Sequence, residues 1–280
     1  MTASPTGQIY MPTQRNLHFR LDPEKVADWN KHSAHISHFM NTLSLFFPVG
    51  ERFFIDSVRH YRDNITEPEL KKAVAAFIGQ EAMHGREHEE YNDAMFAKVP
   101  ATRNMERFVE ALLNQVKKLP KAWQLSTTIA LEHFTAILAD ALLTEPRILE
   151  DADPRYALLW RWHALEETEH KAVAFDVWGT VKGTGPIAYI ERTTGLLMAS
   201  IIFWSIAIPF YLRVLYHEKQ LTHLKGWAQL FSYAFGKVGV LRKLIGPWAD
   251  YFRPSFHPWD HDNRELLDQL EPLAREVEAA

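Results

Sequence analysis

Hydrophobic residues recur at three- and four-residue intervals along most of the chain, and no stretch shows the strict alternation of a half-buried strand. This pattern predicts an all-α protein. The first helix is expected from about residue 28 to 47, and Pro48 then marks its end or a kink. Thr66 is expected to cap a long helix that reaches about Ala97.

The middle of the chain predicts further helices at about residues 105–118, 120–143 and 154–181. Asp153 suits the N-cap of the last one, and Pro154 suits its first helical position. Residues 98–119 then provide a long crossover, with a short helix of its own, between two helical hairpins. We therefore expect helical hairpins in tandem.

The C-terminal part is more apolar, with helices expected at about residues 186–217, 225–246 and 264–278. The run from Thr193 to Leu212 has 20 residues without a charge, which is long enough to cross a bilayer. Pro209 interrupts this run, and small residues such as Gly195 suit packing against another helix. We predict a helix that packs on the bundle and also supplies an apolar surface for membrane docking or dimerisation.

Two stretches repeat the pattern Glu-x-x-His. "GQEAMHGREHEEYN", residues 79–92, contains Glu81 and His84, and "WHALEETEHKAVAF", residues 162–175, contains Glu167 and His170. Residues three positions apart lie on one face of a helix, so the glutamate and histidine of each pair can bind the same ion. A single Glu-x-x-His is weak evidence for a metal site, whereas two such motifs in one chain are stronger evidence.

Each Glu-x-x-His follows a helix that carries one more glutamate among apolar residues. These are Glu51 in "GERFF" and Glu132 in "LEHFT". The weak repeat predicts a four-helix bundle with a ligand set typical of ferritin-like di-iron and di-manganese proteins. The predicted metal ligands are Glu51, Glu81, His84, Glu132, Glu167 and His170. We expect two divalent ions, iron in the first place, with manganese left open.

Other polar residues near these motifs have several candidate roles. His88 and His163 each lie one turn from the ligand stripe, and antiparallel helices would bring both to the same end of the site. We predict them as catalytic residues, while a seventh ligand, a proton relay and a substrate contact stay open. The acids Asp56 and Asp140 are candidate partners of the ligand histidines, although the preferred interpretation is that they face solvent. We expect solvated side chains at Glu89, Glu90, Glu166 and Glu169.

Composition narrows the chemistry. The chain has 280 residues, 47% of them hydrophobic, which suffices for a large core. It has no cysteine, so disulfides, thiolate nucleophiles and iron-sulfur clusters are excluded and metals must bind through His and carboxylates. A net charge of −4 without a long basic run argues against nucleic acid. Residues 1–19 lack an apolar stretch, so we expect a cytoplasmic protein, with membrane association left open.

The same motifs carry a family resemblance. "FPVGERFFIDSVRHYRD", "GQEAMHGREHEEYN", "ALEHFTA" and "WHALEETEHKAVAFDV" resemble the bacterial proteins described as predicted metal-dependent hydrolases, over about residues 15 to 265. The resemblance implies the wider ferritin-like superfamily, metal dependence and the six ligands named above. His88 and His163 also fall within the matching stretches.

These observations predict residues 15–182 as a ferritin-like di-metal bundle and 183–280 as an apolar helical extension that packs on it. The first functional hypothesis is an oxygen-activating di-iron oxidoreductase that acts on an apolar, lipid-like substrate. A metal-dependent hydrolase is the alternative, and a non-catalytic metal-binding protein is the third. Peripheral membrane contact and a homodimer both stay open.

Overall fold

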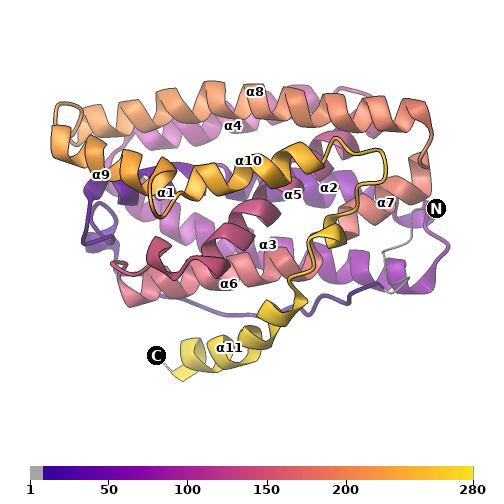
Figure 1. Ribbon diagram of the computed structural model, residues 1–280, viewed down its shortest axis with the longest axis horizontal. Coiled ribbons are helices and arrows are strands. Elements are labelled where there is room, and N and C mark those ends of the chain that lie inside the picture. Colours follow the sequence, from indigo (N-terminus) through magenta and orange to yellow (C-terminus); the bar gives the residue numbers. More distant parts are fainter. Residues whose placement is uncertain (1–8, 280) are drawn as a thin grey trace.

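The computed structural model describes residues 9–279, and Figure 1 shows their helices running mostly along one long axis. The α-helices in this part of the chain are α1 Ala34–Ser44, α2 Phe47–Arg59, α3 Pro68–Lys98, α4 Ala101–Val116, α5 Lys121–Thr144, α6 Pro154–His170, α7 Val173–Lys182, α8 Pro186–His217, α9 Leu224–Phe235, α10 Val240–Asp250 and α11 Leu270–Ala279. Extended pairing within residues 9–279 is limited to an isolated bridge between Asn30 and Ala152. The prediction of an all-α fold is confirmed.

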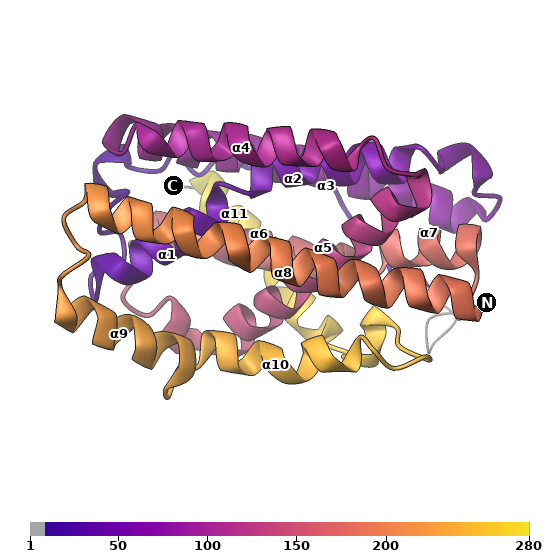
Figure 2. The ribbon, with the colours of Figure 1, turned by 90° about the horizontal axis from the view of Figure 1, so that it is seen from above.

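Four helices enclose the centre of the molecule. Helix α2 packs along α3, α5 packs along α6, and the two pairs meet through α2 with α5 and through α3 with α6. Helix α4 forms the crossover between α3 and α5 and lies on the outside of α2 (Figure 2). The ferritin-like assignment and the division at residue 182 stay predictions.

Helix boundaries differ from the sequence-based expectations at a few places. Pro48 lies in the first turn of α2, where its missing N–H costs nothing, so α1 ends before it. The helix expected to reach residue 181 is interrupted after His170, and the segment expected at 225–246 is two helices. Gly239, with φ of 69°, adopts the left-handed conformation that separates them. The cap Asp153 is confirmed, since its side chain accepts from Arg155 N.

Helix α8 packs across α5 and α1 through one side only. Its Gly195 lies so close to α5 that an added Cβ would come within 2.1 Å of Ser126 Oγ. By length and composition α8 is the one helix among the described residues that could cross a membrane, and 28% of its most apolar window is buried. A large part of its apolar side is therefore uncovered.

The segment from residue 9 to 22, here called the N-terminal strap, runs without helix along α3 and α6 (Figure 1). Thr13 N donates to Glu169 Oε2 over 3.1 Å, and Phe19 N donates to Glu87 Oε2 over 3.0 Å. These bonds tie the strap to both helices. The apolar-poor segment 1–19 named above lies partly outside the described residues, which begin at 9.

Candidate metal centre

The six residues predicted as metal ligands come together between α2, α3, α5 and α6. Each is almost fully buried, with 2% or less of its surface exposed. The side chains are Glu51 from α2, Glu81 and His84 from α3, Glu132 from α5, and Glu167 and His170 from α6. The spacing of three residues on α3 and on α6 turns each glutamate and histidine to the same side.

The distances divide the cluster around two positions. His170 Nε2 lies 3.0 Å from Glu81 Oε1, 3.5 Å from Glu167 Oε2 and 3.7 Å from Glu132 Oε2. On the other side, His84 Nδ1 lies 3.7 Å from Glu167 Oε1. Glu81 joins both groups, because its carboxylate lies with Glu132 and His170 and also with His84 and Glu167, ligand atoms being within 4.8 Å of one another.

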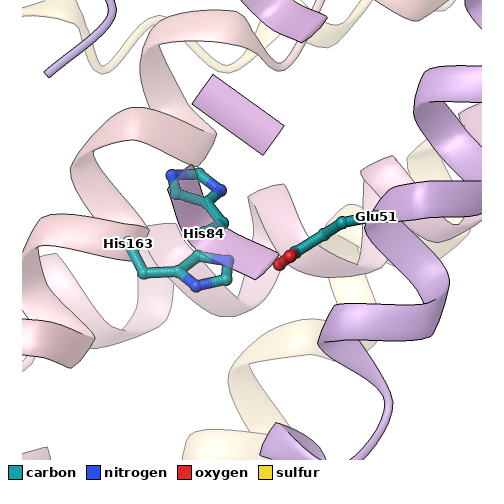
Figure 3. A group of neighbouring side chains, drawn as sticks. All are labelled: Glu51, His84 and His163. Carbon is teal, nitrogen blue, oxygen red and sulfur yellow. The ribbon is translucent and has the colours of Figure 1, made fainter. Parts of the chain in front are cut away.

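A third grouping brings in a histidine outside the predicted ligand set. Ligand atoms of Glu51, His84 and His163 lie within 4.8 Å of one another. Figure 3 shows the carboxylate of Glu51 pointing toward the two imidazoles, which come from the opposite side. The rings of His84 and His163 are stacked, with centroids 4.3 Å apart. His163, predicted as catalytic, thus lies within ligand reach of the same centre.

Most of the polar atoms that face the centre lack hydrogen bonds. This holds for both carboxylate oxygens of Glu51, Glu81 and Glu132, for Oε2 of Glu167, for Nδ1 of His84 and for Nε2 of His170. The short contact between His170 and Glu81 does not have hydrogen-bond geometry. Buried polar groups without partners are costly, and four carboxylates together more so. Divalent cations would satisfy these atoms, so the residues present fit a metal centre.

The pKa shifts of three carboxylates and of His84 agree with this fit. Burial raises the pKa of Glu51, Glu81 and Glu132, and neighbouring carboxylates raise the pKa of Glu51 and Glu132 further. Burial also lowers the pKa of His84 well below its ordinary value, which favours the neutral imidazole that metals require. Ions at the centre would reverse the penalty on the carboxylates, because opposite charge favours the ionised form.

Two of the predicted ligand histidines are held from outside by polar partners. Gln80 Nε2 donates to Glu169 Oε2 and Thr13 O, so its Oε1 is free to accept from His170 Nδ1 over 3.0 Å. This bond leaves Nε2 of His170 facing the centre. Such outer bonds orient metal ligands in proteins. Gln80 is thus a supporting residue that the sequence patterns did not single out.

Glu166 supports the second histidine. Its Oε2 lies 3.2 Å from His84 Nε2, which leaves Nδ1 of that ring facing the centre. Arg15 from the strap donates to Glu166 Oε1 and to Glu169 Oε2, at 3.3 and 3.0 Å. The expectation that Glu166 and Glu169 are solvated is therefore wrong, since 0% and 4% of their surfaces are exposed.

Of the remaining acids, Asp140 is half-buried and the other three are exposed as expected. Glu89 and Glu90 are exposed. Asp56 is also exposed and pairs with Lys117 at 2.7 Å, and Asp140 accepts from Asn263 Nδ2. Neither aspartate touches a ligand histidine in the structure.

His88 and His163 form part of a directed chain of hydrogen bonds. Asn92 Nδ2 donates to Ser44 O, which fixes Asn92 Oδ1 as the acceptor of the Ser44 hydroxyl at 2.7 Å. The Ser44 oxygen then accepts from His88 Nδ1 over 2.8 Å, and His88 Nε2 accepts from His163 Nδ1 over 2.7 Å. His163 Nε2 is left as a lone pair, 3.0 Å from Glu167 Oε1. Two acceptors facing each other need a cation or a proton between them.

An apolar cavity of about 310 Å³ lies beside the cluster, between α2, α4, α5 and α8. Phenylalanine, leucine and other apolar side chains form most of its lining, and Glu51 is the one charged residue among the described residues that line it. Volumes of this size hold small ligands. Glu51 therefore faces both the cluster and the cavity.

The helical fold and the buried carboxylate and histidine cluster are those of a metal-dependent protein. The chain belongs to the family described as predicted metal-dependent hydrolase, whose model matches residues 13–262. No curated protein and no solved structure matches the chain. The family match confirms the resemblance found in the sequence. Its description agrees with the hydrolase alternative and gives no support to the oxidoreductase hypothesis.

Proposed function

We propose that this protein is an enzyme with a two-metal centre that acts on an apolar substrate in the adjoining cavity. The observation that carries the proposal is the set of buried carboxylate oxygens and ring nitrogens that face the two positions without hydrogen bonds. His170, Glu132 and Glu81 would hold one ion. His84 and Glu51 would hold the other, and Glu81 and Glu167 lie where they can reach both.

His163 is proposed as a third histidine ligand at the second ion, in place of the catalytic role expected from its sequence position. Two features support this: its position beside Glu51 and His84, and the lone pair on its inward nitrogen. His88 then acts as a positioning residue, because it accepts the proton of the other ring nitrogen and so sets the tautomer.

When bound, the ions would supply Lewis-acid activation of a water or electrons for reduction of dioxygen, depending on the metal. The side chains of the protein form the apolar cavity next to the ions. Phe46, Phe47 and Phe54 line the cavity next to Glu51 and exclude water from its apolar part. A substrate without polar groups would be held there by burial alone, with its reactive carbon near Glu51.

Two reaction classes remain candidates. Hydrolysis is supported by the description of the family. Oxidation is favoured by the lining of the cavity, because a hydrolase must hold a polar ester, amide or phosphate group. Beyond Glu51, the side-chain hydroxyls among the lining residues are only those of Thr127 and Thr135, and each donates to a backbone carbonyl of its own helix.

Metal analysis tests the two-metal centre and separates the reaction classes. We expect two equivalents of metal per chain in wild-type protein and at most one in Glu81→Ala. Iron with oxygen consumption in the presence of a reductant would support oxidation. Zinc or manganese with hydrolysis of long-chain esters would support a hydrolase. Protein that binds no metal after exposure to iron, manganese and zinc would rule out the centre.

A further inference from the structure

Helix α8 presents an apolar side to solvent along most of its length. Its exposed members Ile190, Leu197, Ile201, Ile208 and Leu212 are here called the α8 face. They recur at intervals of four or seven residues, and each is 38% or more exposed. Of the large hydrophobic side chains exposed among the described residues, most lie between residues 187 and 245. Exposed apolar patches of this kind usually mark binding surfaces.

The opposite side of α8 is fixed to the rest of the molecule by polar bonds. Arg192 donates to Tyr251 O, and Trp248 Nε1 donates to Ser200 Oγ over 3.0 Å. Tyr211 bonds with His35 Nδ1, also over 3.0 Å. Crossing a bilayer would break these bonds and expose polar groups to lipid. The helix is therefore suited to lie flat on a membrane rather than to span it.

Charge around α8 complements an anionic surface. Residues 186–250 contain seven Lys and Arg against three Asp and Glu, in a chain whose net charge is −4. Arg213, Lys219 and Lys225 follow the α8 face directly, and all three are exposed. Within the described part of the chain, none of these three forms an ion pair with a carboxylate. Cations at the edge of an apolar surface are typical of helices that dock on anionic lipids.

The cavity beside the metal centre opens next to this surface. Met198 and Ile202 of α8 and Leu119 at the end of α4 line the cavity and are 49%, 37% and 48% exposed. Figure 2 shows α4 and α8 running beside each other on the same side of the molecule. The cavity therefore leads from the neighbourhood of the α8 face to Glu51.

We propose that the α8 face docks on an anionic lipid bilayer, with α8 parallel to the surface and the mouth of the cavity toward the lipid. An apolar chain from the bilayer can then enter without crossing water, a step that rests on the proposed function. The apolar stripe and the unpaired cations together favour a lipid surface over a second copy of this chain, which would bring like charges together.

Flotation of the full-length protein with vesicles tests the docking. We compare vesicles of phosphatidylcholine with vesicles that also hold about a quarter of phosphatidylglycerol, at low and high salt. Wild-type protein should float with the anionic vesicles, and less at high salt. Leu197→Glu with Ile201→Glu should lower the bound fraction at least about tenfold. Lys219→Glu with Lys225→Glu should lower it by about fivefold or more for each cation.

Met11→Glu and Lys71→Glu are the matched controls, because both positions are exposed and lie outside α8. Both should bind like wild type, and circular dichroism verifies that every variant is folded. Metal-depleted protein should bind equally well, so a failed enzyme proposal would leave this result intact. Absence of wild-type binding, equal binding to both kinds of vesicle, or unchanged binding in the α8 variants would overturn the docking. A dimer that Leu197→Glu with Ile201→Glu dissociates, without vesicle binding, would replace lipid with a second copy.

Discussion

Gln80 Oε1 lies 3.0 Å from His170 Nδ1, and the amide nitrogen of the same side chain lies 2.5 Å from Glu169 Oε2. Gln80 is buried and thus links His170, a residue of the candidate centre, to Glu169, which lies outside it. Because Gln80 Nε2 also donates to Thr13 O, its orientation is fixed by three partners. The ring of His170 is therefore held in one orientation, with Nε2 toward the candidate centre.

Removal of this support should weaken metal binding without removing a ligand. Gln80→Leu keeps the approximate volume but loses the hydrogen bond to His170, so metal affinity should fall about 10- to 100-fold. Competition with a chromophoric chelator measures the change. The exposed Gln115→Leu serves as the control and should bind like wild type. Equal affinities in both variants would show that Gln80 does not position the ring.

Replacement of Glu81, which we propose is shared by both ions, should have the larger effect. Glu81→Ala is expected to lose at least one equivalent of metal and to lower the melting temperature, because bound metal stabilises the folded state. Metal content by elemental analysis and thermal unfolding provide the two readouts. Glu110→Ala, at an exposed position on α4, should change neither. Unchanged metal content in Glu81→Ala would argue against the two-metal centre.

Substitutions of His88 and His163 should have different effects on metal binding. His163→Gln is expected to lose one equivalent of metal, because it removes a proposed ligand. His88→Gln should retain both ions while changing affinity, since it alters the partner of His163 Nδ1 and removes no proposed ligand. Metal titration of the two variants decides the roles. Full metal content in His163→Gln would return this residue to the catalytic role expected from the sequence.

Filling the cavity should block apolar ligands without touching the metals. Thr127→Phe places a ring in the lining of the cavity and should lower binding of a fluorescent fatty acid at least about tenfold. Thr144→Phe is the control, because Thr144 is exposed near the end of the same helix. Fluorescence titration measures binding, and metal analysis should give equal values for both. Unchanged binding in Thr127→Phe would place the ligand elsewhere.

His38 should contribute to unfolding in acid. Burial lowers its pKa from the ordinary 6.5 to about 4. The unfolded chain therefore takes up a proton as pH falls through 6.5, while the folded chain does so only near 4. The free energy of unfolding should fall over this interval by about 3 kcal/mol from this residue.

The variant His38→Gln should show a smaller loss of stability between pH 7 and pH 4, which urea unfolding at several pH values measures. The exposed His60→Gln should keep the wild-type slope. Only the slope is compared, because the substitution also changes packing. An identical slope in His38→Gln would show that His38 titrates normally in the folded protein.

Local patterns were sufficient to predict most of the helices and the residues that meet in the cluster. Glu-x-x-His defines a face within one helix turn, so the pairing of Glu81 with His84 and of Glu167 with His170 follows from the spacing alone. The cap at Asp153 and the extent of α8 were also readable, because caps and uncharged runs are local signals.

Contacts across the fold were not readable in the same way. Glu166 and Glu169 belong to a charge run that usually faces water, and only the approach of Arg15 from the strap makes their burial possible. Likewise, nothing near Gln80 in the sequence marks it as a partner of His170, which is 90 positions away. The break between α6 and α7 after His170 contains no glycine or proline, so the sequence carries no local signal for it.

The contacts of the N-terminal strap are expected to form late in folding. The bonds from Arg15 to Glu166 and Glu169 join residues 151 and 154 positions apart. They can form only after α6 has been synthesised and has taken its place, whereas the hairpin of α2 and α3 is local. Contacts of long sequence separation form late, because loop closure costs entropy. We therefore expect the strap bonds over Glu166 to form after α6 has packed, so that a metal ion could reach the candidate centre from water before they cover it.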